Sequence, residues 1–160
     1  TTMRVADFVA KFILEELDVK HVFTLTGAGI MHLTDGLACN KKLKTICPHH
    51  EQTASMALEA YSRASENFGV GMFTTGPGST NAITGLGGAW QDSVPCLFIG
   101  GQVKRSETSA NSKVPNFSML CFRILAHSFS SFMNFGFEIT QSLYQIPIIL
   151  WIFQKWKVPS

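Results

Sequence analysis

The chain has 160 residues, which is enough for one ordinary domain. Hydrophobic residues make up 46% of it and charged residues 15%, a composition typical of a globular protein and not of a disordered one. The net charge of +2 indicates neither a nucleic-acid partner nor attachment to a membrane surface, and we expect neither.

The four cysteines (Cys39, Cys47, Cys96 and Cys121) form no C-x-x-C pair, so we expect neither a zinc site nor a redox motif. Cys47 and Cys96 lie in apolar stretches and are predicted to be buried as small hydrophobic residues. The first residues lack the basic segment and apolar run of a secretory signal. A reducing, cytoplasmic location is therefore the expectation.

Helical and strand patterns alternate along residues 1–113. Helices are predicted over residues 4–17, 30–38 and 49–67 and from Gly76 onward, with strands at 21–25, 45–47, 69–74 and 96–99. The apolar face of the first helix is predicted to hold Val5, Phe8, Val9, Phe12, Ile13 and Leu17. The buried face of the helix at 49–67 is predicted to hold Ala54, Ala57, Leu58, Tyr61 and Ala64.

Strands that are separated by helices pair in parallel rather than as hairpins. The order therefore predicts an α/β fold, with a doubly wound, mostly parallel sheet and helices on both faces. In such sheets, ligands bind beyond the carboxyl ends of the strands. Three loops are expected to meet there, at residues 26–29, 48–51 and 75–81.

Residues 114–160 differ in composition, being rich in aromatic residues and poor in charge. Their longest uncharged run, 139–154, is shorter than the roughly 18–20 residues of a membrane-spanning helix and contains Pro147, so we expect no span. We interpret 1–113 as the domain and 114–160 as an atypical segment foreign to it. A shifted reading frame or a retained intron would produce such a change, and sequencing the transcript tests this hypothesis.

The motifs of these three loops were first compared with other kinds of site and with a purely structural role. The loop at 26–29 would be a dinucleotide-binding loop only with a third glycine at position 32, which is His32. No metal is expected at His49 and His50, because adjacent residues on a helix do not face each other. Glu51 at a helix start could merely interact with the helix dipole, and Gly76-Pro77-Gly78 could be a plain turn.

Taken together, the motifs resemble one family. They are His49-His50-Glu51-Gln52, Ala60-Tyr61-Ser62-Arg63, the run Thr75 to Ala82, then Ala89, Asp92 and Pro95, and Gly101-Gln102-Val103. In this order and spacing, they are similar to the N-terminal, pyrimidine-binding domain of thiamine-diphosphate (ThDP) enzymes of the acetolactate synthase type. The resemblance covers roughly residues 4–113.

The resemblance implies that Glu51 is catalytic, because in the family this glutamate hydrogen-bonds a ring nitrogen of the cofactor's aminopyrimidine. The cofactor supplies the carbon chemistry of 2-keto acid decarboxylation and carboligation, while the protein supplies orientation and electrostatics. The resemblance also places Pro77 and Asn81 beside the pyrimidine and Leu25 to Gly29 on a loop over it. The implied cofactor-binding residues are Leu25, Thr26, Gly27, Glu51, Gly76, Pro77, Gly78 and Asn81.

Two features depart from the family pattern. A family glutamine is missing from residues 113–117, and no Gly-Asp-Gly motif occurs, although the family uses it to hold Mg²⁺ and the diphosphate in a C-terminal domain. We therefore expect an incomplete fragment that needs a homo-oligomer or a chain carrying that domain. The alternative is a truncated, non-catalytic protein or interaction module with the same fold. FAD, bound by some relatives, has no support in the sequence.

Overall fold

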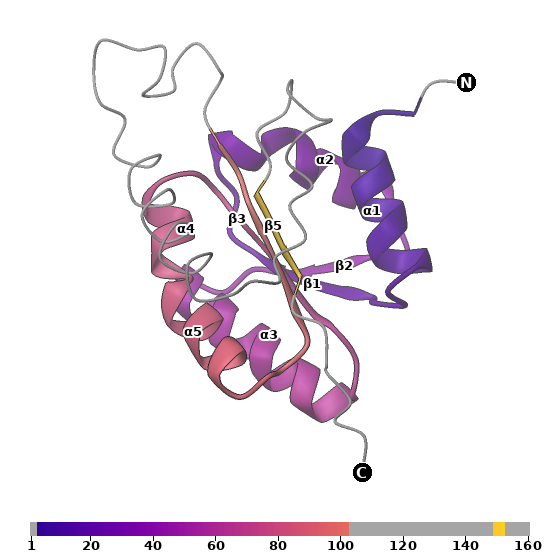
Figure 1. The fold of residues 1–160 in the computed structure, drawn as a ribbon. Coiled ribbons are helices and arrows are strands. Elements are labelled where there is room, and N and C mark those ends of the chain that lie inside the picture. Colours follow the sequence, from indigo (N-terminus) through magenta and orange to yellow (C-terminus); the bar gives the residue numbers. More distant parts are fainter. Residues whose placement is uncertain (1–2, 103–148, 153–160) are drawn as a thin grey trace, which may run out of the picture.

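The computed structural model of the chain describes residues 3–102 and 149–152. Its centre is a five-stranded sheet in the order β2-β1-β3-β4-β5 (Figure 1). The strands are β1 (His21–Thr24), β2 (Lys44–Ile46), β3 (Gly69–Phe73), β4 (Cys96–Gly100) and β5 (Ile149–Ile152). The first four strands pair in parallel. The predicted mostly parallel α/β sheet is confirmed.

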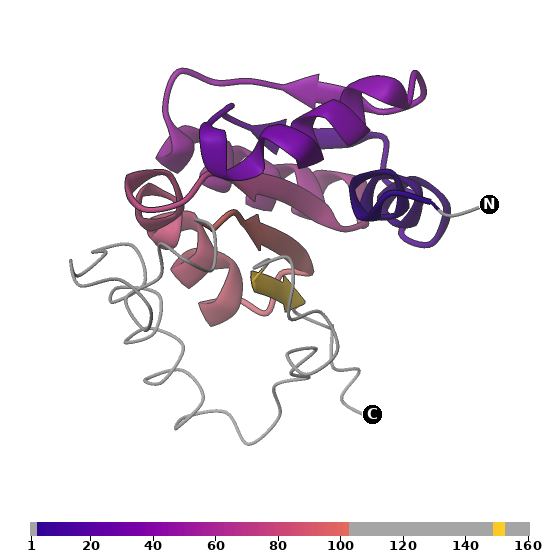
Figure 2. The same ribbon diagram turned by 90° about the horizontal axis from the view of Figure 1, so that it is seen from above.

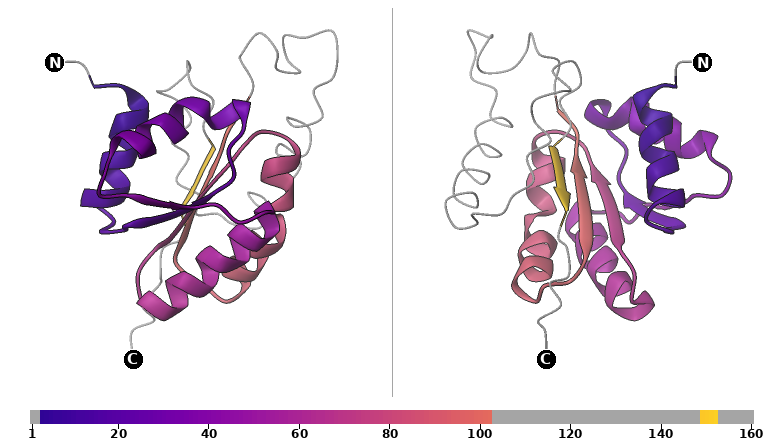
Figure 3. Two further views of the ribbon diagram at one scale, coloured as in Figure 1. Left: turned by 180° about the vertical axis from the view of Figure 1, so that it is seen from behind. Right: turned by 45° about the vertical axis from the view of Figure 1, so that its right-hand side comes forward.

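Helices cover both faces of this sheet. They are α1 (Val5–Glu15), the 3₁₀ turn η1 (Ala28–Ile30), α2 (Met31–Cys39), α3 (Glu51–Ser65), α4 (Pro77–Asn81) and α5 (Ile83–Gln91). Helices α1 and α2 pack together on one face, which we call the first face, and α3 and α5 pack together on the second face (Figure 3). Among the described residues, no helix has the length and apolar character needed to cross a bilayer.

Each face of the sheet has its own hydrophobic core, because successive strand residues point to opposite faces. In β4, Leu97 and Ile99 join the core of the first face, whereas Cys96 and Phe98 join the core of the second. A strand that is buried on both faces has a continuous run of apolar residues in its sequence, as β4 does. This burial fixes the register that brings the carboxyl ends of β1 and β3 to one edge.

Strand β5 lies beyond β4 at the edge of the sheet and runs antiparallel to it, with Leu97 opposite Ile152 (Figure 2). It is the part of the predicted foreign segment 114–160 that the structure describes. The remainder of that segment lies outside the described residues, and the boundary at residue 113 stays a prediction.

Three predictions of burial were wrong. Cys47 is exposed, because it follows β2, an edge strand whose residues are all exposed; Cys96 is buried as predicted. Ala64 is exposed and Ser55 and Ser62 are buried in its place, since the buried stripe of α3 is rotated toward the serines. Phe8 is 58% exposed, because α1 turns Ala6 and Ala10 toward the core.

The helix predicted from Gly76 onward consists of two helices, α4 and α5, joined at Ala82. The helix predicted at 30–38 is preceded by the turn η1. Both differences lie at helix starts near the carboxyl edge of the sheet. The chain there is shaped by contacts between loops that are distant in sequence.

Candidate functional site

The three loops predicted to meet at the carboxyl edge lie together in the structure. Gly27, after β1, packs against Thr74, which directly follows β3. Gly78, in α4, packs against the same threonine and lies close to Glu51 at the start of α3. The parallel order of β1 and β3 explains this meeting, because adjacent parallel strands end at the same edge.

Glu51 is the first residue of α3 and is half-buried. The Asn81 side chain donates a hydrogen bond from Nδ2 to Glu51 Oε2 over 3.1 Å. The other oxygen, Oε1, makes no hydrogen bond to the described residues, and a Cβ added to Gly78 would lie 3.4 Å from it. One carboxylate oxygen is therefore fixed, and the other is available beside a glycine.

The start of α3 is set by His50, whose backbone is extended (φ −148°, ψ 143°). Its ring atom Nδ1 accepts a hydrogen bond from the Gln52 backbone N–H over 3.1 Å. This is the role that serine or aspartate usually has at a helix N-cap. The cap fixes the first turn of the helix and hence the backbone position of Glu51, so His50 has a structural role that the sequence did not predict.

The loop that follows β3 contains the other group of predicted residues. Gly76 has φ 66° and ψ −125°, a conformation that favours glycine. Pro77 then occupies the first turn of α4, where its missing N–H costs nothing. The Ser79 hydroxyl donates to the Thr74 carbonyl oxygen over 2.7 Å. The loop is thus held tightly, with Pro77 exposed and Gly78 buried.

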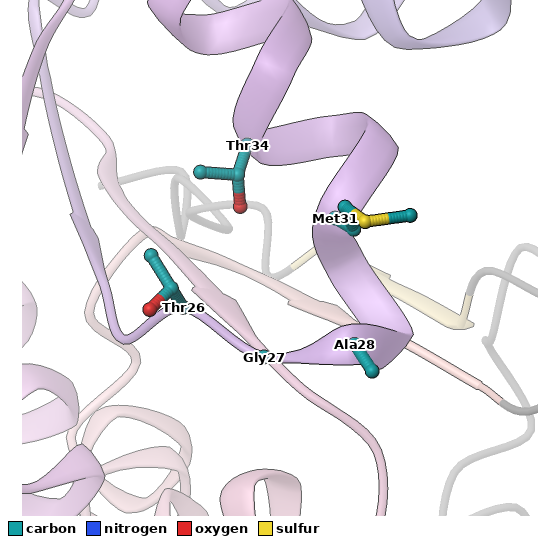
Figure 4. A pocket seen from close by; sticks show the side chains of 5 residues that line it. All are labelled: Thr26, Gly27, Ala28, Met31 and Thr34. Atoms are coloured by element: carbon teal, nitrogen blue, oxygen red, sulfur yellow. The ribbon is translucent and has the colours of Figure 1, made fainter.

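The predicted residues after β1 lie in different surroundings. Leu25 is half-buried against the core of the second face, while Thr26 is exposed. Thr26 and Gly27 line a shallow hollow of about 330 Å³ together with Ala28, Met31 and Thr34 (Figure 4). Neither Glu51 nor any residue of the loop at 76–81 lines this hollow. The eight predicted residues therefore share one edge of the sheet, and two of them, Thr26 and Gly27, line this hollow.

Two threonines that the sequence analysis did not assign to the site connect these loops. Thr74 Oγ1 accepts a hydrogen bond from the Gly29 backbone N–H over 3.1 Å. Thr75 donates from Oγ1 to Gln102 Oε1 over 3.1 Å, which ties the same loop to the end of β4. In the sequence, their position directly before Gly76-Pro77 was the signal that could have assigned these threonines to the site. Within residues 3–102 and 149–152, no three His, Cys, Asp or Glu side chains gather as a metal site.

The fold is that of an α/β domain, a class in which ligands bind beyond the carboxyl ends of the parallel strands. A comparison of the sequence with known protein families identifies the family of the chain. The family described as thiamine pyrophosphate enzyme, N-terminal TPP binding domain, matches residues 3–121, and the chain belongs to it. Thiamine pyrophosphate (TPP) is the same molecule as ThDP.

The chain is also similar to curated acetolactate synthases. It is 44% identical over 93 residues to the enzyme of Mycobacterium leprae, covering 58% of this chain and 15% of that protein. It is 40% identical over 116 residues to the acetolactate synthase large subunit of Cyanidium caldarium, an alignment that covers 69% of this chain and 20% of that protein. It is 38% identical over 95 residues to the mitochondrial acetolactate synthase of Schizosaccharomyces pombe, an alignment that covers 59% of this chain and 14% of that protein. The chain thus spans a fifth or less of these relatives.

The residues at this edge fit a pyrimidine ring. A ring nitrogen beside Glu51 Oε1 would share a proton with that oxygen, while Asn81 holds Oε2. A Cβ added to Gly78 would lie 2.5 Å from Thr74 Cγ2 and 3.4 Å from Glu51 Oε1, so the glycine lets this loop lie close to the carboxylate. The described residues contain no group of three His, Cys, Asp or Glu side chains that could hold the metal of a diphosphate.

Proposed function

We propose that this chain is the pyrimidine-binding part of a ThDP-dependent enzyme of the acetolactate synthase type, which decarboxylates a 2-keto acid and joins the product to a second carbonyl compound. The hydrogen bond between Asn81 and Glu51 is the observation that carries the proposal. It orients a half-buried carboxylate at the edge where the family's cofactor-binding loops meet.

Each residue has a distinct role in this proposal. Asn81 fixes Oε2 of Glu51, so that Oε1 holds a shared proton toward a ring nitrogen of the pyrimidine. ThDP, when bound, supplies the carbon–carbon bond chemistry. Gly76, Pro77 and Gly78 shape the loop beside the ring, and Leu25, Thr26 and Gly27 form the loop on its other side. A carboxylate in this role works best where water is excluded.

The proposed site is completed by a second domain. The diphosphate and its Mg²⁺ would be held by a diphosphate-binding domain, either elsewhere in a longer polypeptide or in a partner chain. The small share of each relative that this chain spans supports this assignment. The free thiols Cys39, Cys47 and Cys96 support a reducing compartment such as the cytoplasm.

The binding proposal is tested by titrating the 160-residue chain with thiamine and with ThDP, with and without Mg²⁺, while following backbone amide NMR signals. Millimolar binding is expected, with shifts concentrated at residues 25–27, 51 and 76–81 and with no dependence on Mg²⁺. Glu51→Gln should weaken both ligands alike. Shifts confined to other residues would contradict the proposal, and tight Mg²⁺-dependent binding would show a diphosphate site within this chain.

The catalytic proposal needs a polypeptide that includes the diphosphate domain. There, Glu51→Gln is expected to abolish decarboxylation of pyruvate while the circular dichroism spectrum stays unchanged. Equal activity of that variant would rule out Glu51 as the catalytic residue.

The second candidate is a non-catalytic module with the same fold. The absence of any binding of thiamine or ThDP by the chain would favour this candidate.

A further inference from the structure

Thr74 begins the loop after β3 and packs against the loop after β1, and these two loops carry most of the proposed cofactor-binding residues. It follows the last residue of β3 and is half-buried. A Cβ added to Gly27 would lie 2.5 Å from Thr74 Cβ, and one added to Gly78 would lie 2.5 Å from Thr74 Cγ2. Both separations are too short for real atoms, so each loop approaches this side chain as closely as its backbone permits.

Thr74 also holds both loops by hydrogen bonds. Its Oγ1 accepts from the Gly29 N–H over 3.1 Å, and its backbone carbonyl accepts from the Ser79 hydroxyl over 2.7 Å. The Gly29 amide belongs to the turn η1, whose N-cap residue, Gly27, has no side chain to accept from the first amides. Thr74 therefore supplies, from the loop after β3, the acceptor that a helix start needs.

We propose that Thr74 is a positioning residue that sets the separation of the loop after β1 from the loop before α4. This inference rests on the proposed function, since it concerns the geometry of the pyrimidine site. Gly27 and Gly78 both pack against Thr74, and Gly78 also lies next to the Glu51 carboxylate. If the contact between the loops loosens, the two sides of the site separate while Glu51 and Asn81 remain paired.

Two variants separate the hydroxyl from the shape of this side chain. Thr74→Val keeps a branched side chain against Gly27 and Gly78 but removes the acceptor for the Gly29 amide. Thr74→Ser keeps the acceptor. Thr75→Val is the matched control, because it makes the same change at the next position, where the hydroxyl bonds to Gln102 instead.

The first measurement is hydrogen exchange of the Gly29 amide in the unliganded 160-residue chain. Loss of one hydrogen bond predicts exchange about three- to tenfold faster in Thr74→Val, and near-normal exchange in Thr74→Ser and Thr75→Val. This measurement needs no ligand, so it judges the contact between the loops independently of the proposed function. Equal Gly29 exchange in Thr74→Val and Thr75→Val would overturn the inference.

The second measurement is the dissociation constant for thiamine, from amide NMR titration. We expect Thr74→Val to weaken binding several-fold and Thr74→Ser to restore it, with the Asn81 side-chain signal unchanged. Unaltered affinity in Thr74→Val, despite faster Gly29 exchange, would overturn the positioning role. If the wild-type chain binds no thiamine, the proposed function fails, and with it the positioning role, while the exchange data still decide whether Thr74 connects the loops.

Discussion

The two faces of the sheet are packed in different ways. The buried core of the first face, beneath α1 and α2, consists of aliphatic residues and methionine. The core of the second face contains Phe23, Phe73 and Phe98, and Phe73 and Phe98 stack with their ring centroids 5.9 Å apart. Helix α3, which begins with Glu51, lies on this second face.

Both faces contain close approaches between backbones. On the first face, a Cβ added to Gly36 would lie 2.6 Å from the Ala6 carbonyl oxygen, and on the second face two such approaches both involve α3. A Cβ added to Gly69 would lie 2.1 Å from the Leu58 carbonyl oxygen, and one added to Gly85 would lie 2.5 Å from the Ser55 carbonyl carbon. Helix α3 is thus held between β3 and α5 with little freedom to shift. The difference teaches that first-face packing stabilises the fold, whereas second-face packing also positions the candidate site.

Truncation of a core residue on each face should have the largest effect. Ile13 on the first face and Leu58 on the second are both fully buried. Ile13→Ala and Leu58→Ala should each lower the free energy of unfolding by about 2–5 kcal/mol in chemical denaturation. Only Leu58→Ala should shift the NMR signal of the Asn81 side-chain amide, because α3 relaxes into the cavity. An equal shift in both variants would refute the distinction between the faces.

The contact between α3 and α5 should give the next largest effect. A Cβ added to Gly85 would lie 2.4 Å from Ser55 Oγ, so Gly85→Ala forces the helices apart and should cost about 1–3 kcal/mol. Gly87→Ala is the control on the same helix, since a Cβ there meets nothing within 4 Å. It should raise stability by about 0.5–1 kcal/mol. Similar stability changes in the two variants would show that the helices are not in tight contact.

A pH effect in the alkaline range should arise from Cys96 on the second face. Burial raises the pKa of the Cys96 thiol from 9.0 to about 12. Between these values the unfolded state loses this proton and the folded state keeps it, so the free energy of unfolding falls as pH rises. The decrease is at most about 1.4 kcal/mol per pH unit.

Cys96→Ala should remove this part of the pH dependence, measured by urea unfolding at pH 8, 9 and 10 under reducing conditions. The difference between wild type and variant should be constant below pH 9 and should shrink above it. A difference independent of pH would mean that Cys96 ionises readily in the folded protein.

The exposed ion pairs should have the smallest effect. Arg4 joins Asp7 to Asp35 on the first face, and Arg63 joins Glu59 to Asp92 on the second. Arg4→Gln and Arg63→Gln should each lower the thermal midpoint only slightly, because exposed pairs gain little and are screened by salt. The decrease should diminish further in high salt, and a large, salt-independent decrease in either variant would contradict this view.

The sequence predicted the order of helices and strands well because apolar periodicity and glycine or proline breaks are local. The predictions of burial failed where a neighbouring element determined which residues of a helix are buried. Ser55 and Ser62 are buried on α3 because Gly85 makes room for the first, and the carbonyls of Asn67 and Pro95 lie within 2.8 Å of the second hydroxyl. Hydrophobicity alone placed Ala64 there instead.

For the candidate site, the motifs predicted which loops would meet, since parallel strands end at one edge. They did not predict how the loops are held. His50 caps α3 through a ring nitrogen, and Thr74 accepts the Gly29 amide from 45 residues away in the chain. Neither contact leaves a periodic signal in the sequence.

The sequence by itself determined the parallel α/β fold, the family and the identity of the loops, because those properties depend on local pattern and on motifs in order. The tertiary structure alone decided that Asn81 holds Glu51 and that Gly27 and Gly78 both pack against Thr74. These contacts join residues from different strands and helices. Their distances depend on how the sheet and the helices of the second face pack, and no local pattern specifies that packing.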